Sequence, residues 1–186
     1  MSENGFLPKR GGYRNLRVYR IAEIIYDLTF EFTGRCLSKG DRTIDQMIQA
    51  ARSGKQNIAE GSKASSTSTG TEIKLTNVAK ASLEELLIDY EDYLRVRNLQ
   101  QWSTGHPRYN RLREYCRSDE FVGGYRELLP RMNAEEMCNM AITLINQATY
   151  LLARLIKKQE QMFLEQGGIR EQMTRARLAY RQGRKE

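Results

Sequence analysis

The sequence predicts an all-α protein: an up-down four-helix bundle with an extra short helix and a basic C-terminal tail helix. In four long segments, apolar residues recur at spacings of three and four, which is typical of amphipathic helices. No segment of useful length alternates apolar and polar residues as a strand would. The 186 residues are 40% hydrophobic and 28% charged, as in ordinary globular proteins. A chain of this length and composition can form one hydrophobic core without disulfide bonds or a bound metal. Amphipathic helices of this kind bury their faces against one another, so a bundle follows.

Composition divides the chain into three parts. Residues 1–12 contain three glycines and a proline, and we expect a flexible arm. Residues 13–166 form the predicted four-helix bundle domain, and residues 167–186 form a basic tail. Between the third and fourth helices, glycines and prolines over 101–132 predict an irregular insert with one short helix at about 107–117.

The first two helices are predicted from their apolar faces. The first runs from about residue 14 to 35 and buries Val18, Ile21, Ile25, Leu28 and Phe32. The second runs from about residue 41 to 60 and buries Ile44, Met47, Ile48, Ala51 and Ile58. We expect the second helix to stop at Gly61, because glycine is a common residue just beyond a helix.

The third helix follows a polar loop over 62–71. Thr69 and Glu72 match a capping box, with Thr69 as the N-cap residue. The helix should extend to about Arg97. Its expected buried face is formed by Leu75, Val78, Ala79, Ser82, Leu86, Ile88 and Tyr93 or by their near neighbours.

The fourth helix opens with a second capping box, formed by Asn133 and Glu136, and runs to about Glu165. Its apolar stripe is Met137, Ala141, Leu144, Ile145, Ala148, Leu151, Leu152, Leu155, Met162 and Phe163. In the tail, a narrow helical edge is expected to dock on the protein: Ile169, Met173, Ala176 and Tyr180. Arg170, Arg177, Arg181 and Arg184 share a neighbouring arc.

Several function classes are disfavoured by what the sequence lacks. His106 is the only histidine, so histidine triads and multi-histidine metal sites are excluded. Glycine-rich phosphate loops are absent, and we predict no enzymatic activity, no cofactor and no metal. Cys36, Cys116 and Cys138 are too widely spaced for a zinc knuckle, and we expect buried free thiols. With no signal peptide and no long apolar run, a cytoplasmic protein without membrane association is expected.

The net charge of +7 is concentrated at the two ends. Residues 1–20 carry five basic residues against one acidic residue, and residues 169–186 carry six against two. The body between them is close to neutral. Basic ends are typical of chains that contact a polyanion or an acidic partner, although such charge can also serve solubility alone. The candidate nucleic-acid-binding residues are Arg10, Arg14, Arg17, Arg20, Arg170, Arg177, Arg181 and Arg184.

Three strings also carry a family resemblance: RNLRVY at 14–19, QNIAEG at 56–61 and VAKASLEEL at 78–86. They resemble the bacterial four-helix-bundle proteins first noticed as reading frames inside intervening sequences of 23S ribosomal RNA genes. The accessory variability determinant of diversity-generating retroelements is related to that family. The segment QGGIREQMTRAR at 166–177 resembles a C-terminal suffix found on a subgroup of these proteins.

The resemblance implies a ring-shaped homo-oligomer, typically a pentamer, without enzymatic activity. Accessory members assist a reverse transcriptase and bind nucleic acid. Asn57 and Glu60, one helical turn apart, either cross an oligomer interface or cap their own bundle. The leading hypothesis is therefore an oligomeric accessory protein that binds nucleic acid, RNA in particular, and that assists a reverse transcriptase. The alternative is an oligomeric scaffold whose basic ends bind an acidic protein partner, for example the 84–92 acidic cluster of a neighbouring subunit.

Overall fold

The computed structural model describes residues 12–182, which form helices and connecting turns without a strand. The prediction of an all-α fold is confirmed. The α-helices are α1 (Arg17–Cys36), α2 (Thr43–Ala64), α3 (Thr69–Val96), α4 (Tyr109–Tyr115), α5 (Asp119–Leu128), α6 (Ala134–Gln166) and α7 (Ile169–Gln182). Two short 3-10 helices, η1 (Tyr13–Asn15) and η2 (Leu129–Arg131), precede α1 and α6.

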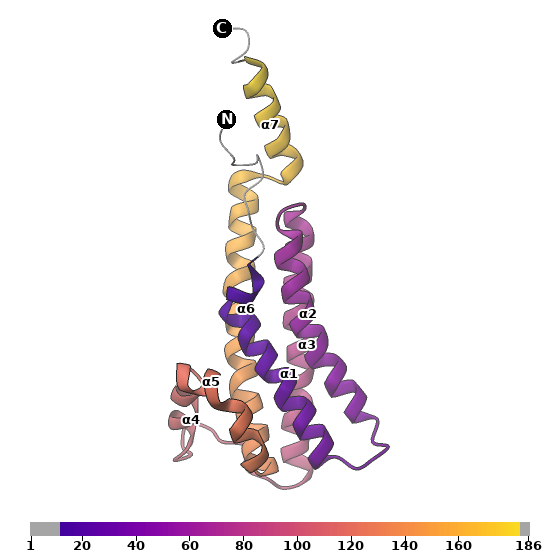
Figure 1. Ribbon diagram of the computed structural model, residues 1–186, viewed down its shortest axis with the longest axis vertical. Coiled ribbons are helices and arrows are strands. Elements are labelled where there is room, and N and C mark those ends of the chain that lie inside the picture. Colours follow the sequence, from indigo (N-terminus) through magenta and orange to yellow (C-terminus); the bar gives the residue numbers. More distant parts are fainter. Residues whose placement is uncertain (1–11, 183–186) are drawn as a thin grey trace.

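The four long helices α1, α2, α3 and α6 form an up-down bundle (Figure 1). Around the bundle, α1 packs on α2, α2 on α3, α3 on α6, and α6 on α1. The helices differ in length, since α1 has 20 residues whereas α6 has 33. At the upper end of Figure 1, α6 and the α2–α3 hairpin therefore continue beyond the first residue of α1, and α7 follows α6 at the tip.

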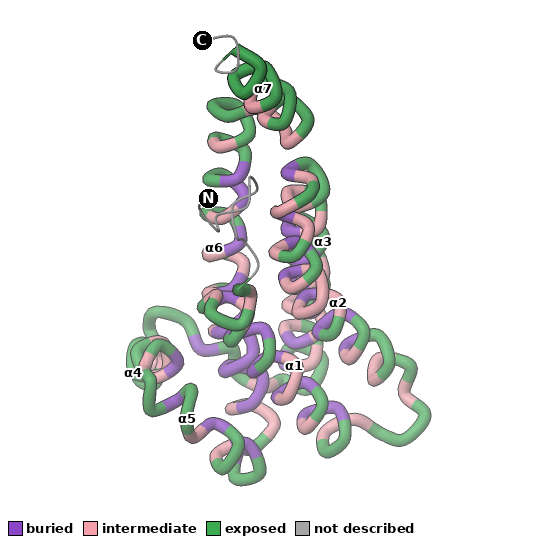
Figure 2. Tube along the Cα trace, turned by 45° about the horizontal axis from the view of Figure 1, so that its top comes forward, coloured by how far each residue is buried: buried purple, intermediate pink, exposed green. Residues whose placement is uncertain are grey.

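The core runs along the inner faces of these helices (Figure 2). All five residues predicted for the inner face of the first helix are buried, as is Leu152 in the middle of α6. The three cysteines are free thiols: Cys116 and Cys138 are buried, and Cys36 is half-buried. For α1, the 3.6-residue period of the apolar residues predicted the buried face correctly.

The predicted inner face of α3 is partly wrong. Val78 and Ile88 are exposed, with relative accessibilities of 39% and 58%. The buried positions include Leu83, Tyr90 and Leu94, which continue the spacing set by Ala79 and Leu86. In α3 apolar residues occur on more than one face, so apolarity alone does not select the face that meets α2 and α6.

The predicted end of the second helix at Gly61 is also wrong, because α2 continues to Ala64. Gly61 is buried within the helix, and a Cβ placed there would lie 3.4 Å from the Cβ of Leu75 in α3. Gly54 is closer still, since its Cβ would lie 2.7 Å from Cδ2 of Leu83. Both glycines allow α2 and α3 to approach closely, so they serve packing and not helix termination.

Of the two predicted capping boxes, one is confirmed. Asn133 Oδ1 accepts from the Glu136 amide at 2.9 Å, and Glu136 Oε2 accepts from the Asn133 amide at 3.1 Å. The other is wrong by one residue, because the N-cap of α3 is Ser68, whose Oγ accepts from the amide of Thr71. Thr69 is buried in the first turn of α3, so its side chain is not free to cap the helix.

The insert over 101–132 is not irregular, because it contains α5 and η2 as well as the predicted short helix α4. Phe121 is fully buried, and Tyr125, one turn later in α5, donates a 2.6 Å hydrogen bond to Asp27 Oδ2 in α1. These anchors hold α5 as a helix although Gly123 and Gly124 lower its propensity. Both glycines face away from the core, so no side chain is missing from the packing.

Burial raises the pKa of the Cys116 thiol to about 12 and raises the pKa values of Cys36 and Cys138 as well. Because the thiolate is the reactive form, the native protein should react slowly with iodoacetamide at pH 8, with Cys36 reacting first. Mass spectrometry of alkylated native and urea-unfolded protein checks this, and rapid native labelling of Cys116 would contradict the packing of α4.

Candidate nucleic-acid interface

Helix α7 presents a row of arginines to solvent. Arg170, Arg177 and Arg181 are all exposed, and their spacings of seven and four residues place them on one face. At 1.5 Å per residue, the row extends over about 16 Å. Among the described residues, these three guanidinium groups make no hydrogen bond or ion pair. The predicted arginine arc is therefore present as far as Gln182, while Arg184 lies outside the described residues.

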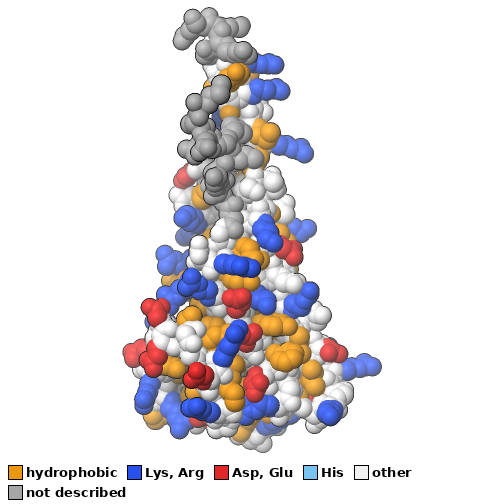
Figure 3. All heavy atoms as spheres, viewed as in Figure 1, with side chains coloured by type: hydrophobic (Ala, Val, Ile, Leu, Met, Phe, Trp, Pro, Cys, Tyr) orange, Lys and Arg blue, Asp and Glu red, His pale blue; other side chains and the backbone are white. Residues whose placement is uncertain are grey.

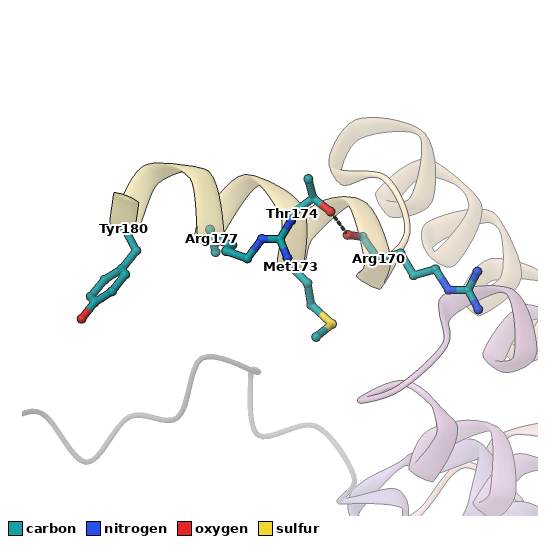
Figure 4. A pocket seen from close by; sticks show the side chains of 6 residues that line it. Arg170, Met173, Thr174, Arg177 and Tyr180 are labelled. Carbon is teal, nitrogen blue, oxygen red and sulfur yellow. Dashed lines mark hydrogen bonds between the residues drawn. The ribbon is translucent and has the colours of Figure 1, made fainter. Parts of the chain in front are cut away.

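The prediction that the neighbouring edge of the tail docks on the protein is wrong. No residue of α7 is buried, and Met173 and Tyr180 have relative accessibilities of 51% and 65%. Figure 4 shows Met173 and Tyr180 pointing to one side of α7, while Arg170 extends from the first turn toward the bundle. Helix α6 extends beyond α1, α2 and α3 before α7 begins, so no core formed by the described residues 12–182 lies at this height to cover an apolar edge.

Arg175 differs from the other arginines of α7. Its Nη2 donates a 2.6 Å hydrogen bond to the backbone carbonyl of Gln166, the last residue of α6. The side chain is thus turned back to the α6–α7 joint, on the side of the helix away from the arginine row. Beside it, the Gly168 amide donates to Glu171 Oε2 at 2.8 Å, just before the first residue of α7. Arg175 therefore has a structural partner, whereas Arg177 has none within residues 12–182.

The predicted arginines at the other end lie at the start of α1. Arg17 donates to the backbone carbonyl of Arg117 at 3.3 Å, and Arg20 donates to the carbonyl of Arg14 at 3.3 Å. All three predicted side chains, Arg14 included, remain exposed. Arg10 lies outside the described residues.

The structure adds cations that sequence analysis missed. The Nζ of Lys63, at the end of α2, lies 5.5 Å from the ring centroid of Tyr13, beside Arg14 on the same ring at 5.8 Å. On α6, Lys157 and Lys158 are exposed between the level of α1 and that of α7. The adjacent lysines in the sequence could have indicated this pair of cations. They were missed because the net charge was counted over the whole body of the chain, where nearby acidic residues cancel them.

The described members of the two predicted arginine groups, Arg14, Arg17 and Arg20 and Arg170, Arg177 and Arg181, are not brought together. Leu155 of α6 lies at the level of Leu16, where α1 begins, and 11 further residues of α6 lead to Gln166. That length corresponds to about 16 Å. Figure 3 shows Asp and Glu mainly over the lower half of the visible face, while Lys and Arg continue upward to α7. On this face, the end of the molecule that carries α7 is basic, whereas the opposite end carries both acidic and basic side chains.

Asn57 and Glu60 do not end a helix, since α2 continues beyond both. Asn57 Nδ2 donates to the backbone carbonyl and the hydroxyl of Ser53 at 2.9 and 3.1 Å, and that hydroxyl lies 2.9 Å from Ser82 Oγ in α3. Asn57 therefore joins α2 to α3 within its own bundle. Glu60 is exposed on the outer side of α2.

The acidic cluster on α3 contains a carboxylate with a raised pKa. Asp89 is half-buried, and desolvation raises its pKa, with further contributions from Glu85 and Asp92 on the same face. Neighbouring acids are neutralised by cations of their own helix, as Lys80 pairs with Glu84 at 2.6 Å and Arg95 with Asp92 at 2.7 Å. Within the described part of the chain, Asp89 has no ion pair.

Across residues 12–182, no group of three or more His, Cys, Asp or Glu side chains is placed to hold a metal ion. None of the helices in this range combines the length and the apolar character that crossing a membrane requires. Comparison of the chain with protein-family models, with curated proteins and with solved structures finds no match.

Proposed function

We propose that this protein is a non-enzymatic, oligomeric nucleic-acid-binding protein that contacts the phosphates of RNA through the arginine row of α7. The observation that carries the proposal is that Arg170, Arg177 and Arg181 lie on one exposed helical face, where their guanidinium groups make no hydrogen bond or ion pair with any residue of 12–182. Guanidinium groups bind phosphate oxygens in a bidentate way, and neutralising phosphates releases counterions. An accessory role beside a reverse transcriptase belongs to the same proposal and rests on the family resemblance.

The aromatic residues beside these cations support a single-stranded ligand. Tyr180 is exposed and lies on the same open hollow of α7 as Arg177, and the half-buried Tyr13 has Arg14 and Lys63 within 6 Å of its ring centroid. Bases of a single strand can stack on exposed tyrosines while the backbone follows the basic row. Duplexes keep their bases stacked inside, so this arrangement favours single-stranded RNA over duplex.

Filter binding of a labelled, mixed-sequence single-stranded RNA at several salt concentrations tests the proposal. We expect affinity to fall steeply with salt, since each neutralised phosphate contributes a slope of about −0.7 in log–log form. A matched RNA duplex is the control and should bind more weakly. Absence of RNA binding even at low salt, together with co-purification of a second polypeptide, would contradict the proposal.

The oligomeric part of the proposal is supported by large apolar side chains exposed on several helices. Ile88, Val96, Tyr150, Leu164 and Leu178 have relative accessibilities between 49% and 83%. Apolar surface beyond the needs of one core is commonly covered by another subunit. Light scattering at micromolar concentration should therefore give a mass several times 21.6 kDa. A monomeric mass would contradict this part of the proposal.

The second candidate function is an oligomeric scaffold whose basic ends bind an acidic protein surface, for example the acidic face of α3 in a neighbouring subunit. Asp89 on that face favours this candidate, because it is a half-buried carboxylate that makes no ion pair with the described residues. Its pKa is raised, so the folded state of the free chain binds this proton more tightly than the unfolded state does. The contribution of Asp89 to stability is thus present at low pH and is lost as the pH rises through the folded pKa. If the acidic face of α3 stays open to solvent, Asp89→Asn should raise the Tm at pH 7 and leave it almost unchanged near pH 3.

If basic side chains of a neighbouring subunit instead cover the acidic face, Asp89→Asn should lower the Tm at pH 7 and reduce the mass seen by light scattering. Thermal unfolding at fixed protein concentration separates the two cases. A lower Tm would favour the scaffold over the nucleic-acid interface.

A further inference from the structure

The outer side of α6 is basic over a long stretch. Residues 137–159 contain three basic residues, Arg154, Lys157 and Lys158, and no Asp or Glu. All three are exposed, and they lie on the side of the helix opposite the buried Leu152. Within the described part of the chain, the two lysines make no hydrogen bond or ion pair. Three cations are therefore available to an acidic partner.

Tyr150 adds an aromatic ring to this surface. The side chain is 62% exposed, and the Arg154 guanidinium one turn later lies 5.9 Å from the ring centroid. Tyrosine and arginine are enriched in protein–protein interfaces and often provide much of the binding energy. Together, Tyr150, Arg154, Lys157 and Lys158 form what we call the α6 strip, which extends over about 12 Å.

An open groove of about 400 Å³ lies between the outer sides of α2 and α3. Small side chains line it at Ala50, Ser53 and Ser82, and the two serine hydroxyl oxygens lie 2.9 Å apart. Asp45 and Glu85 also line the groove, and both are exposed. This α2–α3 groove therefore offers space for a large side chain beside carboxylate groups.

The carboxylates at the α2–α3 groove are not neutralised. Asp89 follows Glu85 by one turn on α3 and is half-buried. Among the described residues, neither of them nor Asp45 makes an ion pair, whereas other acids of α3 pair with cations of their own helix. From Asp45 to Ser53 the groove side of α2 extends over about 12 Å, which equals the length of the α6 strip.

The two surfaces lie on different sides of the bundle. Figures 1 and 2 both show α6 on one side and the α2–α3 pair on the other. The α6 strip faces away from the core, so it cannot reach the groove of its own chain. A second copy can present its strip to that groove, because the two surfaces match in length and are opposite in charge.

We propose that the α6 strip of one subunit docks in the α2–α3 groove of a second copy of this chain, with the Tyr150 ring in the groove and the three cations facing its three carboxylates. The inference rests on the oligomeric part of the proposed function and names its contact surfaces. Each subunit uses two different surfaces, so the contact is heterologous and assembles head to tail. Opposite charges fix the register and prevent like surfaces from pairing. Since the cations come from α6, the contact leaves the arginine row of α7 accessible to RNA.

Light scattering of the full chain tests this interface after nuclease treatment and at one fixed protein concentration. The strip variant carries Arg154→Glu, Lys157→Glu and Lys158→Glu, and the groove variant carries Asp45→Lys, Glu85→Lys and Asp89→Lys. Each variant alone should have the monomer mass of 21.6 kDa, because like charges then meet across the interface. In an equimolar mixture the reversed surfaces complement one another, so the mass should return to at least two subunits.

A control variant carries the same change in charge as the strip variant. Its substitutions, Arg111→Glu, Arg117→Glu and Arg131→Glu, replace exposed arginines of the insert between α3 and α6. It should keep the mass of the unmodified protein. Tyr150→Ala tests the interface without a change in charge and should weaken self-association by about tenfold. Far-UV circular dichroism of every variant should match that of the unmodified protein.

The outcomes separate this interface from the proposal on which it rests. A monomeric unmodified protein would contradict the oligomeric part of the proposed function and the interface together. If both reversed variants keep the oligomeric mass, the oligomer stands and the interface is wrong. If they are monomeric and remain so when mixed, the two surfaces do not meet. If the strip variant keeps its mass but loses RNA affinity, the strip belongs to the nucleic-acid interface instead.

Discussion

Replacing Phe32 by alanine should lower the free energy of unfolding by about 3–5 kcal/mol. Phe32 is fully buried in the last third of α1, and its ring lies 5.0 Å from that of Tyr90 and 4.8 Å from that of Tyr93, centroid to centroid. The Tyr90 hydroxyl donates to Thr29 Oγ1 at 3.0 Å, which holds this aromatic cluster in place. Truncation leaves a cavity that fixed neighbours cannot fill. Urea unfolding followed by circular dichroism measures the loss.

Phe30→Ala is the matched control, because Phe30 lies two residues away on the same helix and is 62% exposed. It should change the free energy of unfolding by less than about 0.5 kcal/mol. Equal losses in the two variants would contradict the placement of α1, since they would require both side chains to be buried to the same extent.

Neutralising Arg170, Arg177 and Arg181 together to glutamine should flatten the salt dependence of RNA binding by about two units of slope. The figure follows from a contribution of about 0.7 per phosphate on single strands and three contacts. Affinity should fall at every salt concentration. Filter binding at four salt concentrations, as for the unmodified protein, provides both numbers.

A control variant with the same change in net charge separates local contact from overall attraction. Arg42, Arg111 and Arg131 are exposed and lie away from α7. Their joint replacement by glutamine should leave the slope within about half a unit of the unmodified protein. If both triple variants flatten the slope equally, binding depends on net charge and not on the arginine row.

The long helices could be predicted from the sequence because their signals are local and repeated. Val18, Ile21 and Leu28 recur at helical spacing, and each is buried. The cap at Asn133 was found for the same reason, since both of its hydrogen bonds are made within four residues. At the start of α3, by contrast, Ser68 and Thr69 can both cap a helix. Only the tertiary burial of Thr69 decides between them.

The features that the sequence could not show depend on contacts between distant segments. Gly123 and Gly124 weaken the helical signal of α5 in the sequence. The helix is nevertheless stable because Tyr125 donates a hydrogen bond to Asp27, 98 residues away in the chain. The orientation of Arg175 depends on a carbonyl at the end of α6. The exposure of Met173 depends on where the bundle ends beneath α7, and helical periodicity contains no information on the length of neighbouring helices.

The arginine row of α7 is tested most directly by comparing Arg177→Gln with Arg175→Gln in the same RNA-binding assay. The two residues lie two positions apart on one helix and carry the same charge, but only Arg175 bonds the α6 carbonyl. Arg177→Gln should flatten the salt slope by about 0.7, whereas Arg175→Gln should leave it nearly unchanged. Equal effects of the two substitutions would contradict a formed α7 that presents one face to RNA.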